Sequence, residues 1–227
     1  NLRLPRIIMA VLIGMMLSSS GAVLQTVFQN PLADPYIIGI AASATFGAVI
    51  AFIFNLPDFM YGVLAFVFSL LSTFFIFKMA KKGNRINVTV LLITGIAVSS
   101  FLGAFTSLAV YLIGEDSFKI TMWTMGYLGN ATWKRILCIF IPLVFSTGYF
   151  YMKRHELDAL LSGDEEAYSL GVDVDRLKIK ILAVSSLVVA FSAAFSGMIG
   201  FVGLVVPHIV RMITGSSNGK LLPNTIF

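Results

Sequence analysis

The chain has 227 residues; 58% of them are hydrophobic, 12% are charged and the formal net charge is +5. Soluble domains carry about 25% charged residues, so a soluble globular fold is excluded, because it could not hide this much apolar surface from water. The basic residues fall between apolar segments, so they indicate membrane orientation and docking rather than nucleic-acid binding. A single Cys and two distant His residues exclude an intramolecular disulfide and give no metal-site pattern.

Charge-free apolar segments follow one another along the chain, and each reaches or nearly reaches the roughly 17–25 residues that a membrane-spanning helix needs. They cover residues 7–33, 35–57, 59–77, 86–114, 136–152 and 181–207. The stretch 114–135 is too polar to span, and its Met and aromatic residues predict a short helix at the level of the lipid headgroups. The sequence therefore predicts an all-α fold, a polytopic membrane helix bundle.

A compact basic cluster sets the expected orientation. It consists of Lys78, Lys81, Lys82 and Arg85, and the positive-inside rule places it in the cytoplasm. Alternation then puts residues 34–35 and 153–180 on the cytoplasmic side. The N-terminus, the turn at 55–58, residues 115–135 and everything after Gly197 fall outside. Because Asp and Glu are almost absent from the spans, the pattern argues against a proton-coupled pump.

Two apolar segments carry the same polar signature. Ser20-Gly21 is followed ten residues after the glycine by Pro31, and Ser196-Gly197 is followed at the same distance by Pro207. The two segments run antiparallel in this topology, which predicts an inverted repeat of the kind found in transporters; a chance match is the alternative. Gln25 lies on a stripe of small residues in the first span, and its amide suggests a wet helix face.

Residues 153–176 form the one sizeable polar excursion on the cytoplasmic side. Within it, Gly163 and Gly171 bracket a short predicted helix with acidic residues in its first turn, as the helix dipole favours. This segment is either a solvated loop or a surface on which a cytoplasmic motor docks. The chain contains no phosphate-binding GxxxxGK[ST] loop, so energy for transport would have to come from another chain.

Four motifs then occur in a specific order. They are RLPR at 3–6, SGAVLQTVFQNPLADPYIIGI at 20–40, GDEEAYSLGV at 163–172 and GFVGLVVPHIVR at 200–211. Over essentially the whole chain they resemble the permease family of ABC importers for iron-siderophores, haem and vitamin B12. The resemblance implies a multi-pass subunit of the cytoplasmic membrane with the type II importer fold and no cofactor or enzymatic activity of its own. By that pattern residues 1–227 are a single transmembrane permease domain, a fragment without the first and last helices.

The resemblance also implies partners: a second permease copy in a homodimer, cytoplasmic ATP-binding subunits that hydrolyse ATP, an extracytoplasmic substrate-binding protein, and membrane lipid. Arg3 and Arg6 would pair with acidic residues of the binding protein. The inner gate and translocation path would involve Gln25, Asn30, Pro31 and Leu32. Pro31 removes an N–H and restricts the residue before it, so the first helix should break there.

Coupling to the ATPase would rest, within the cytoplasmic segment 153–180, on Gly163, Asp164, Glu165, Glu166, Ala167, Leu170 and Gly171. Ser162 departs from the Leu that the family more often has there. A structural motif on the outer side would consist of Gly200, Gly203, Pro207 and His208, with His208 expected in a structural hydrogen bond.

The expected function is a permease that works by alternating access, in which ATP binding and hydrolysis on partner subunits move the coupling helix and shift the inner gate. An ion-coupled secondary transporter with an inverted repeat is the alternative, and a membrane receptor or scaffold is a third. Family frequency favours a ferric siderophore as substrate, then haem, then cobalamin.

Overall fold

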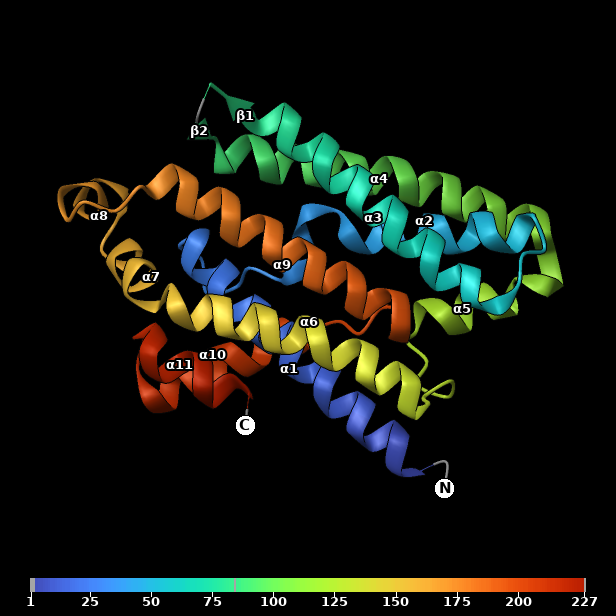
Figure 1. The fold of residues 1–227 in the computed structure, drawn as a ribbon. Coiled ribbons are helices and arrows are strands. Elements are labelled where there is room, and N and C mark those ends of the chain that lie inside the picture. Colours follow the sequence, from blue (N-terminus) through green and yellow to red (C-terminus); the bar gives the residue numbers. More distant parts are fainter. Residues whose placement is uncertain (1–2, 84, 227) are drawn as a thin grey trace.

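The computed structural model describes residues 3–83 and 85–226, which are almost entirely helical (Figure 1). The long helices are α1 (Arg3–Val27), α3 (Asp58–Ala80), α4 (Val88–Ile113), α6 (Trp133–Met152) and α9 (Val174–Ser196). The shorter ones are η1 (Pro35–Ile38), α2 (Ile40–Ile53), η2 (Gly114–Ser117), α5 (Phe118–Thr124), α7 (Arg154–Leu161), α8 (Asp164–Ser169), α10 (Val202–Thr214) and α11 (Asn218–Ile226). Strands β1 (Lys81–Lys82) and β2 (Arg85–Ile86) pair as an antiparallel hairpin. The predicted all-α bundle is confirmed, since five of these helices are long and apolar enough to cross a membrane.

The bundle has two distinct ends (Figure 1). The β1–β2 hairpin, α7, α8 and the turn between α10 and α11 lie at the left of Figure 1, and we call this the inner end because it carries the basic cluster at 78–85. The N-terminus, the α2–α3 turn and α5 lie at the opposite, outer end. The short helix α5 confirms the one predicted within 114–135.

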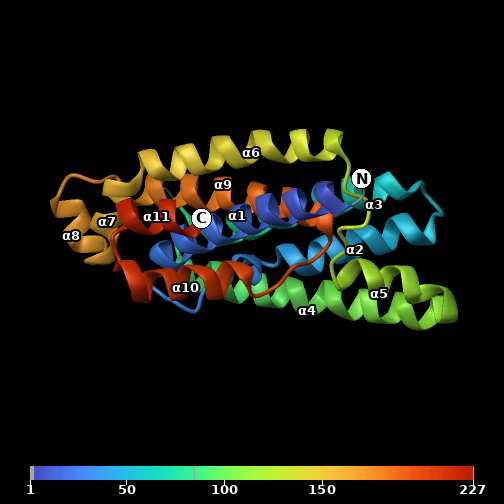
Figure 2. The same ribbon diagram turned by 90° about the horizontal axis from the view of Figure 1, so that it is seen from below.

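Helices α1 and α9 form the centre of the bundle. Seen from below, they lie between α6 on one side and α4 with α10 on the other (Figure 2). Most residues in the apolar part of these two helices are buried within the chain, whereas fewer than a third are buried in α3, α4 and α6. Exposed Phe, Leu and Ile on these outer helices suit contact with lipid rather than water. Side-chain caps begin several of the long helices; Asn87 accepts from Val90 N at 3.0 Å, and Asp173 accepts from Arg176 N at 3.2 Å.

The last predicted span, 181–207, is two helices instead of one. Helix α9 ends at Ser196, and left-handed residues at Gly197 (φ 68°) and Phe201 (φ 67°) reverse the chain. Helix α10 then returns to the inner end, where Asn218 hydrogen-bonds to Asp158 of α7. The prediction that everything after Gly197 lies outside is therefore wrong. The basic residues after Gly197 therefore lie on the inner side, which strengthens the excess of positive charge expected there.

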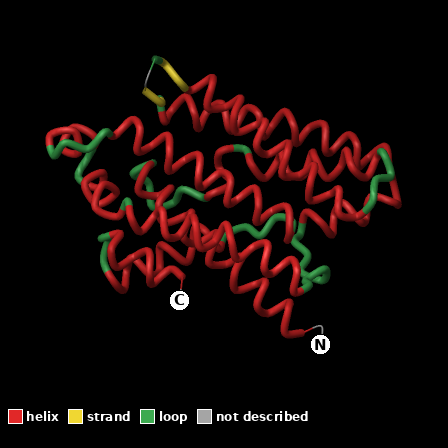
Figure 3. The backbone as a smooth tube through the Cα atoms, viewed as in Figure 1, coloured by secondary structure: helices red, strands yellow, loops and turns green. Residues whose placement is uncertain are grey.

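The non-helical segments after α1 and after α9 run into the bundle (Figure 3), and the helices that follow them, η1 and α10, meet there. A methyl group at Gly203 would overlap the Pro35 ring and lie 2.8 Å from Leu17 O. Leu17 is ten residues before the end of α1 at Val27, which is about 15 Å at 1.5 Å per residue. Residues 34–35, predicted in a cytoplasmic loop, thus lie deep in the bundle, where the Asp34 carboxylate caps η1 by accepting from Tyr36 N at 2.7 Å.

Each of the two central helices is followed by such a break and then by a short helix. Helix α1 leads to α2, which has 14 residues, and α9 leads to α10, which has 13. Because α1 runs from the outer to the inner end and α9 runs the other way, the two units are antiparallel, as the predicted inverted repeat requires.

Candidate functional site: the inner turn and the helices beside it

Helix α1 ends in a tight left-handed turn at the inner end, and we call residues 28–33 the inner turn. Gln29 N donates to Thr26 O at 3.1 Å and Asn30 N donates to Gln25 O at 3.0 Å, while Gln29 has φ 50°. These two bonds and the left-handed residue make a Schellman motif, which usually has glycine at that position. The predicted break near Pro31 is present, but the chain reverses at Gln29, a residue that the sequence analysis did not single out.

Leu32 in the inner turn is held in an exposed position. The Asn30 side chain accepts from Leu32 N at 2.9 Å, which closes a second small turn around Pro31. Leu32 is 65% exposed, so the described part of the chain leaves most of its side chain uncovered. Gln25 behaves differently: it is 1% exposed and donates from Nε2 to Leu204 O of α10 at 3.2 Å. Gln25 is therefore buried against α10, not on a wet face.

Helices α7 and α8 project beyond the inner end of the bundle (Figure 1). The hydrogen bond from Lys153 Nζ to Glu156 at 2.8 Å fastens the start of α7 and raises the pKa of Lys153. Gly163, with φ 121°, joins α7 to α8 in a conformation that favours glycine, and Gly171, with φ 82°, follows α8 in another. The predicted short helix between these two glycines is confirmed as α8.

One face of α8 is anchored and the other is free. Ala167 is fully buried in the same apolar cluster as Leu157 and Leu160 of α7, which makes α7 and α8 one packed unit. Glu165 is exposed, and Leu170, just after the helix, is 71% exposed. An acidic and apolar surface at the inner end is thus available to another protein.

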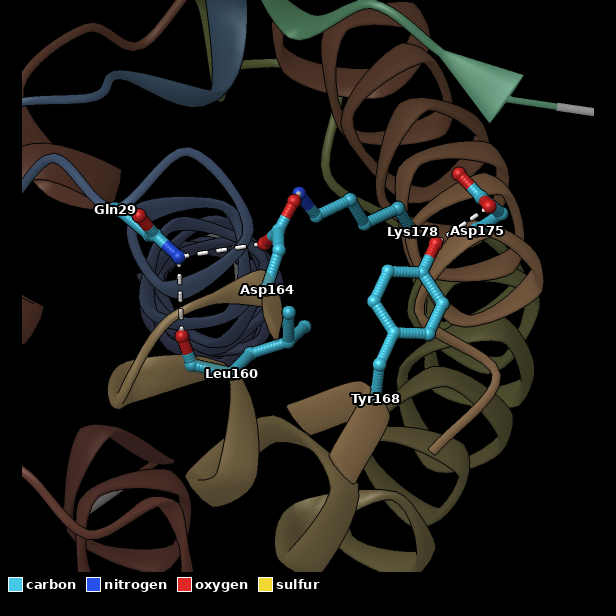
Figure 4. Close-up of polar contacts among 6 residues, drawn as sticks. All are labelled: Gln29, Leu160, Asp164, Tyr168, Asp175 and Lys178. Atoms are coloured by element: carbon cyan, nitrogen blue, oxygen red, sulfur yellow. Dashed lines mark hydrogen bonds and ion pairs between the residues drawn. The ribbon is translucent and has the colours of Figure 1, made fainter. Parts of the chain in front are cut away.

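The Asp164 carboxylate links three parts of the chain (Figure 4). Its Oδ2 lies 2.5 Å from Lys178 Nζ of α9, and its Oδ1 accepts from Gln29 Nε2 of the inner turn at 3.4 Å. Gln29 Nε2 also donates to Leu160 O at the end of α7, at 3.2 Å. Lys178 is 7% exposed, so Asp164 is the partner that compensates its buried charge. Beside this network, Tyr168 Oη donates to Asp175 Oδ2 at 2.6 Å and ties α8 to α9 a second time.

Helix α7 also holds the turn between α10 and α11. Asp158 accepts from Asn218 N at 2.6 Å, from Asn218 Nδ2 at 2.9 Å and from Ser217 Oγ at 2.9 Å. Asn218 is fully buried, and its Oδ1 accepts from Thr26 Oγ1 of α1 at 3.3 Å. The sequence analysis missed this network, because bonds between residues so far apart in the chain leave no local pattern.

At the outer end the two predicted arginines are exposed, and Arg6 Nη2 donates to Gly129 O at 3.4 Å. The predicted outer motif is not confined to that side. Gly200 lies in the outer loop, Gly203 lies at the crossing with Pro35, and Pro207 is buried within α10 as that helix runs inward. The His208 side chain makes no hydrogen bond to another residue that the structure describes, so the expected structural bond is not seen.

The model of the FecCD transport family matches residues 1–227. The chain belongs to this family. The cobalamin import permease BtuC of Halobacterium salinarum is 40% identical over 98% of this chain, and the hemin transport permease HmuU of Yersinia pestis is 36% identical over 98%. The chain spans 61% and 69% of the lengths of these two relatives.

The fold of this FecCD chain also matches a solved structure, described as an inward-facing conformation of an ABC transporter assigned to the metal-chelate type. The TM-score is 0.90 and the identity 33%, over 99% of this chain and 72% of the solved one. Together with the membrane-length helices, these findings make the chain a multi-pass protein of the cytoplasmic membrane. They do not favour the ion-coupled secondary transporter.

Proposed function

We propose that this chain is the membrane-spanning permease subunit of an ATP-driven importer that moves an iron chelate, haem or cobalamin by alternating access. ATP hydrolysis takes place on separate cytoplasmic subunits, and the permease performs no chemistry itself. The observation that carries the proposal is the α7–α8 unit, which projects from the inner end with an exposed acidic and apolar surface. Membership of the FecCD transport family supports it.

The ATP-binding subunits dock on α8 in this proposal. Glu165 and Glu166 lie in its first turn, where the helix dipole favours acids, and a cationic groove would complement them. Gly163 and Gly171 set the angle of α8, Asp164 and Ala167 anchor it, and Leu170 adds an apolar contact. Nucleotide-driven movement of the partner therefore acts first on this short helix.

The inner gate is the inner turn in this proposal. Asn30 and Pro31 shape the turn, and the exposed Leu32 packs against its counterpart in a second copy of the chain. The Gln25 side chain can line the translocation path only if α10 moves away, because its amide nitrogen donates a hydrogen bond to Leu204 O of that helix. At the outer end, Arg3 and Arg6 receive an acidic surface of a substrate-binding protein, since Arg pairs well with carboxylates.

The docking proposal is tested by reversing charge on α8 in the full-length complex. We expect Glu165→Lys with Glu166→Lys to lower co-purification of the ATP-binding subunits about tenfold and to uncouple ATP hydrolysis from uptake into vesicles. The matched control, Glu165→Gln with Glu166→Gln, keeps the side-chain size and should retain most of both. Normal assembly and uptake in the Lys variant would remove α8 as the docking surface, and uptake driven by an ion gradient without ATP would refute the importer.

A further inference from the structure

Gln29 occupies a backbone position that suits glycine better than glutamine. Its φ of 50° is left-handed, and the Cβ of an L-residue is crowded there. Such strain persists where the surroundings over-determine it, and the observed outlier then points to a use of the side chain. The turn itself needs no side chain at this position, because both of its bonds are made by backbone N–H groups.

The Gln29 amide reaches the junction of α7 and α8. From one Nε2 it donates to Leu160 O, in the last turn of α7, and to Asp164 Oδ1, at the first residue of α8 (Figure 4). Among the residues that the structure describes, no other side chain of the inner turn hydrogen-bonds to α7 or α8. The amide is therefore the polar link between the turn and the helix pair.

The far side of Asp164 is held by Lys178. The ammonium group is nearly buried, and a buried charge must keep its partner, so the carboxylate stays with α9 while α8 rests in this position. A displacement of α8 must either carry Gln29 with it or break these bonds. Because Asn30 follows Gln29 directly and holds Leu32 N, movement of Gln29 is passed on to Leu32.

We propose that Gln29 is the positioning residue that makes the inner turn follow the α7–α8 unit, through its shared bonds to Leu160 O and the Asp164 carboxylate. This rests on the proposed function, in which α8 receives the movement and Leu32 closes the path. In this scheme Gln29 does not contact the substrate. It makes the position of the inner turn depend on the position of the α7–α8 unit.

The test removes the amide without harming the turn. Gln29→Gly deletes both side-chain bonds and relieves the left-handed strain, so the turn should persist. Asn55→Gly is the matched control: Asn55 has φ 48°, and at the end of α2 Asn55 N bonds Phe52 O at 2.9 Å and Leu56 N bonds Ala51 O at 2.9 Å, the same motif. The α2–α3 turn lies at the outer end, far from α7 and α8.

The readout is disulfide cross-linking between copies at Leu32→Cys, with Cys138→Ser, in full-length complexes in vesicles with and without a non-hydrolysable ATP analogue. We expect the analogue to change the cross-linking yield at least threefold in the parent and in Asn55→Gly, and less than 1.5-fold in Gln29→Gly. ATP hydrolysis should stay within twofold of the parent in all three, while uptake falls about tenfold in Gln29→Gly alone.

A nucleotide response in Gln29→Gly equal to that of the parent would overturn the positioning role and leave the importer intact. A parent that shows no nucleotide response would instead contradict the proposed function. Asp164→Ala gives a second test: combined with Gln29→Gly it should reduce uptake by less than the product of the two single effects, because both variants remove the same bond between Gln29 and Asp164. If the effects of the two single variants on uptake multiply in the double variant, the proposal is overturned. It is also overturned if the complex fails to assemble with Gln29→Gly and with Gln29→Asn.

Discussion

Gly21 and Gly14 lie two turns apart on α1, and the same substitution should affect them with opposite signs. A methyl group built on Gly21 would overlap the backbone carbonyl of Gly203, whereas one built on Gly14 meets no atom within 4 Å. Gly21→Ala therefore forces α1 and α10 apart where they cross, while Gly14→Ala enters empty space.

The expected magnitudes follow from two competing effects. Replacing glycine by alanine inside a helix gains about 0.5–1 kcal/mol, and both variants share this gain. Overpacking costs about 1–3 kcal/mol where side chains can shift, and more where the obstacle is backbone, as it is at Gly21. We expect Gly14→Ala to stabilise the protein by about 0.5–1 kcal/mol and Gly21→Ala to destabilise it by about 2 kcal/mol.

The assay is reversible unfolding of the full-length protein in mixed detergent micelles, followed by tryptophan fluorescence. Gly203→Ala acts at the same crossing, because its methyl group would meet Leu17 O and Pro35. It should therefore destabilise as Gly21→Ala does, and the double variant should lose less than the sum of the two. Equal free energies of unfolding for the Gly14 and Gly21 variants would show that the two segments do not pack closely at mid-depth.

Two further predictions concern the ends of the bundle. Asp158→Ala should lower the free energy of unfolding by about 2–3 kcal/mol, because it leaves the buried Asn218 amide without its acceptor, whereas Ser217→Ala should cost under about 1 kcal/mol; similar losses in the same unfolding assay would contradict this network. Reversing Arg3 and Arg6 to Glu should slow association with the proposed substrate-binding protein and flatten the salt dependence of that association, and an unchanged affinity at low and high salt, measured by surface plasmon resonance, would exclude docking there.

The sequence predicts those features that depend on local pattern. Apolar length alone locates the long spans, since a membrane leaves the backbone no alternative to a helix. The acidic first turn between Gly163 and Gly171 predicts α8, and Pro31 marks the break after α1. Each of these signals depends on residues within one or two helical turns of each other.

The features that depend on distant contacts were not predictable in the same way. Residues 181–207 contain no charge, so they read as one span, and only the left-handed backbone at Gly197 and Phe201 divides them. Gln29 and Asp164 are 135 residues apart, and nothing near either residue indicates the other. The sequence analysis placed Pro207 on the outer side of the membrane for the same reason, because it missed the reversal of the chain after α9.

The two networks at the inner end act on opposite halves of the fold. Helices α7 and α8 pack against each other through one buried apolar cluster, and we have called this pair the α7–α8 unit. Through Asp164 the unit holds the turn after α1, and through Asp158 it holds the turn after α10. Helices α1 and α10 cross with their backbones in contact at Gly21 and Gly203. No side chain lies between the two helices at this crossing, so one helix cannot shift there without displacing the other. In the proposed mechanism, a force on α7–α8 would therefore reach the inner turn and the turn after α10 together, and both halves of the repeat should respond to it.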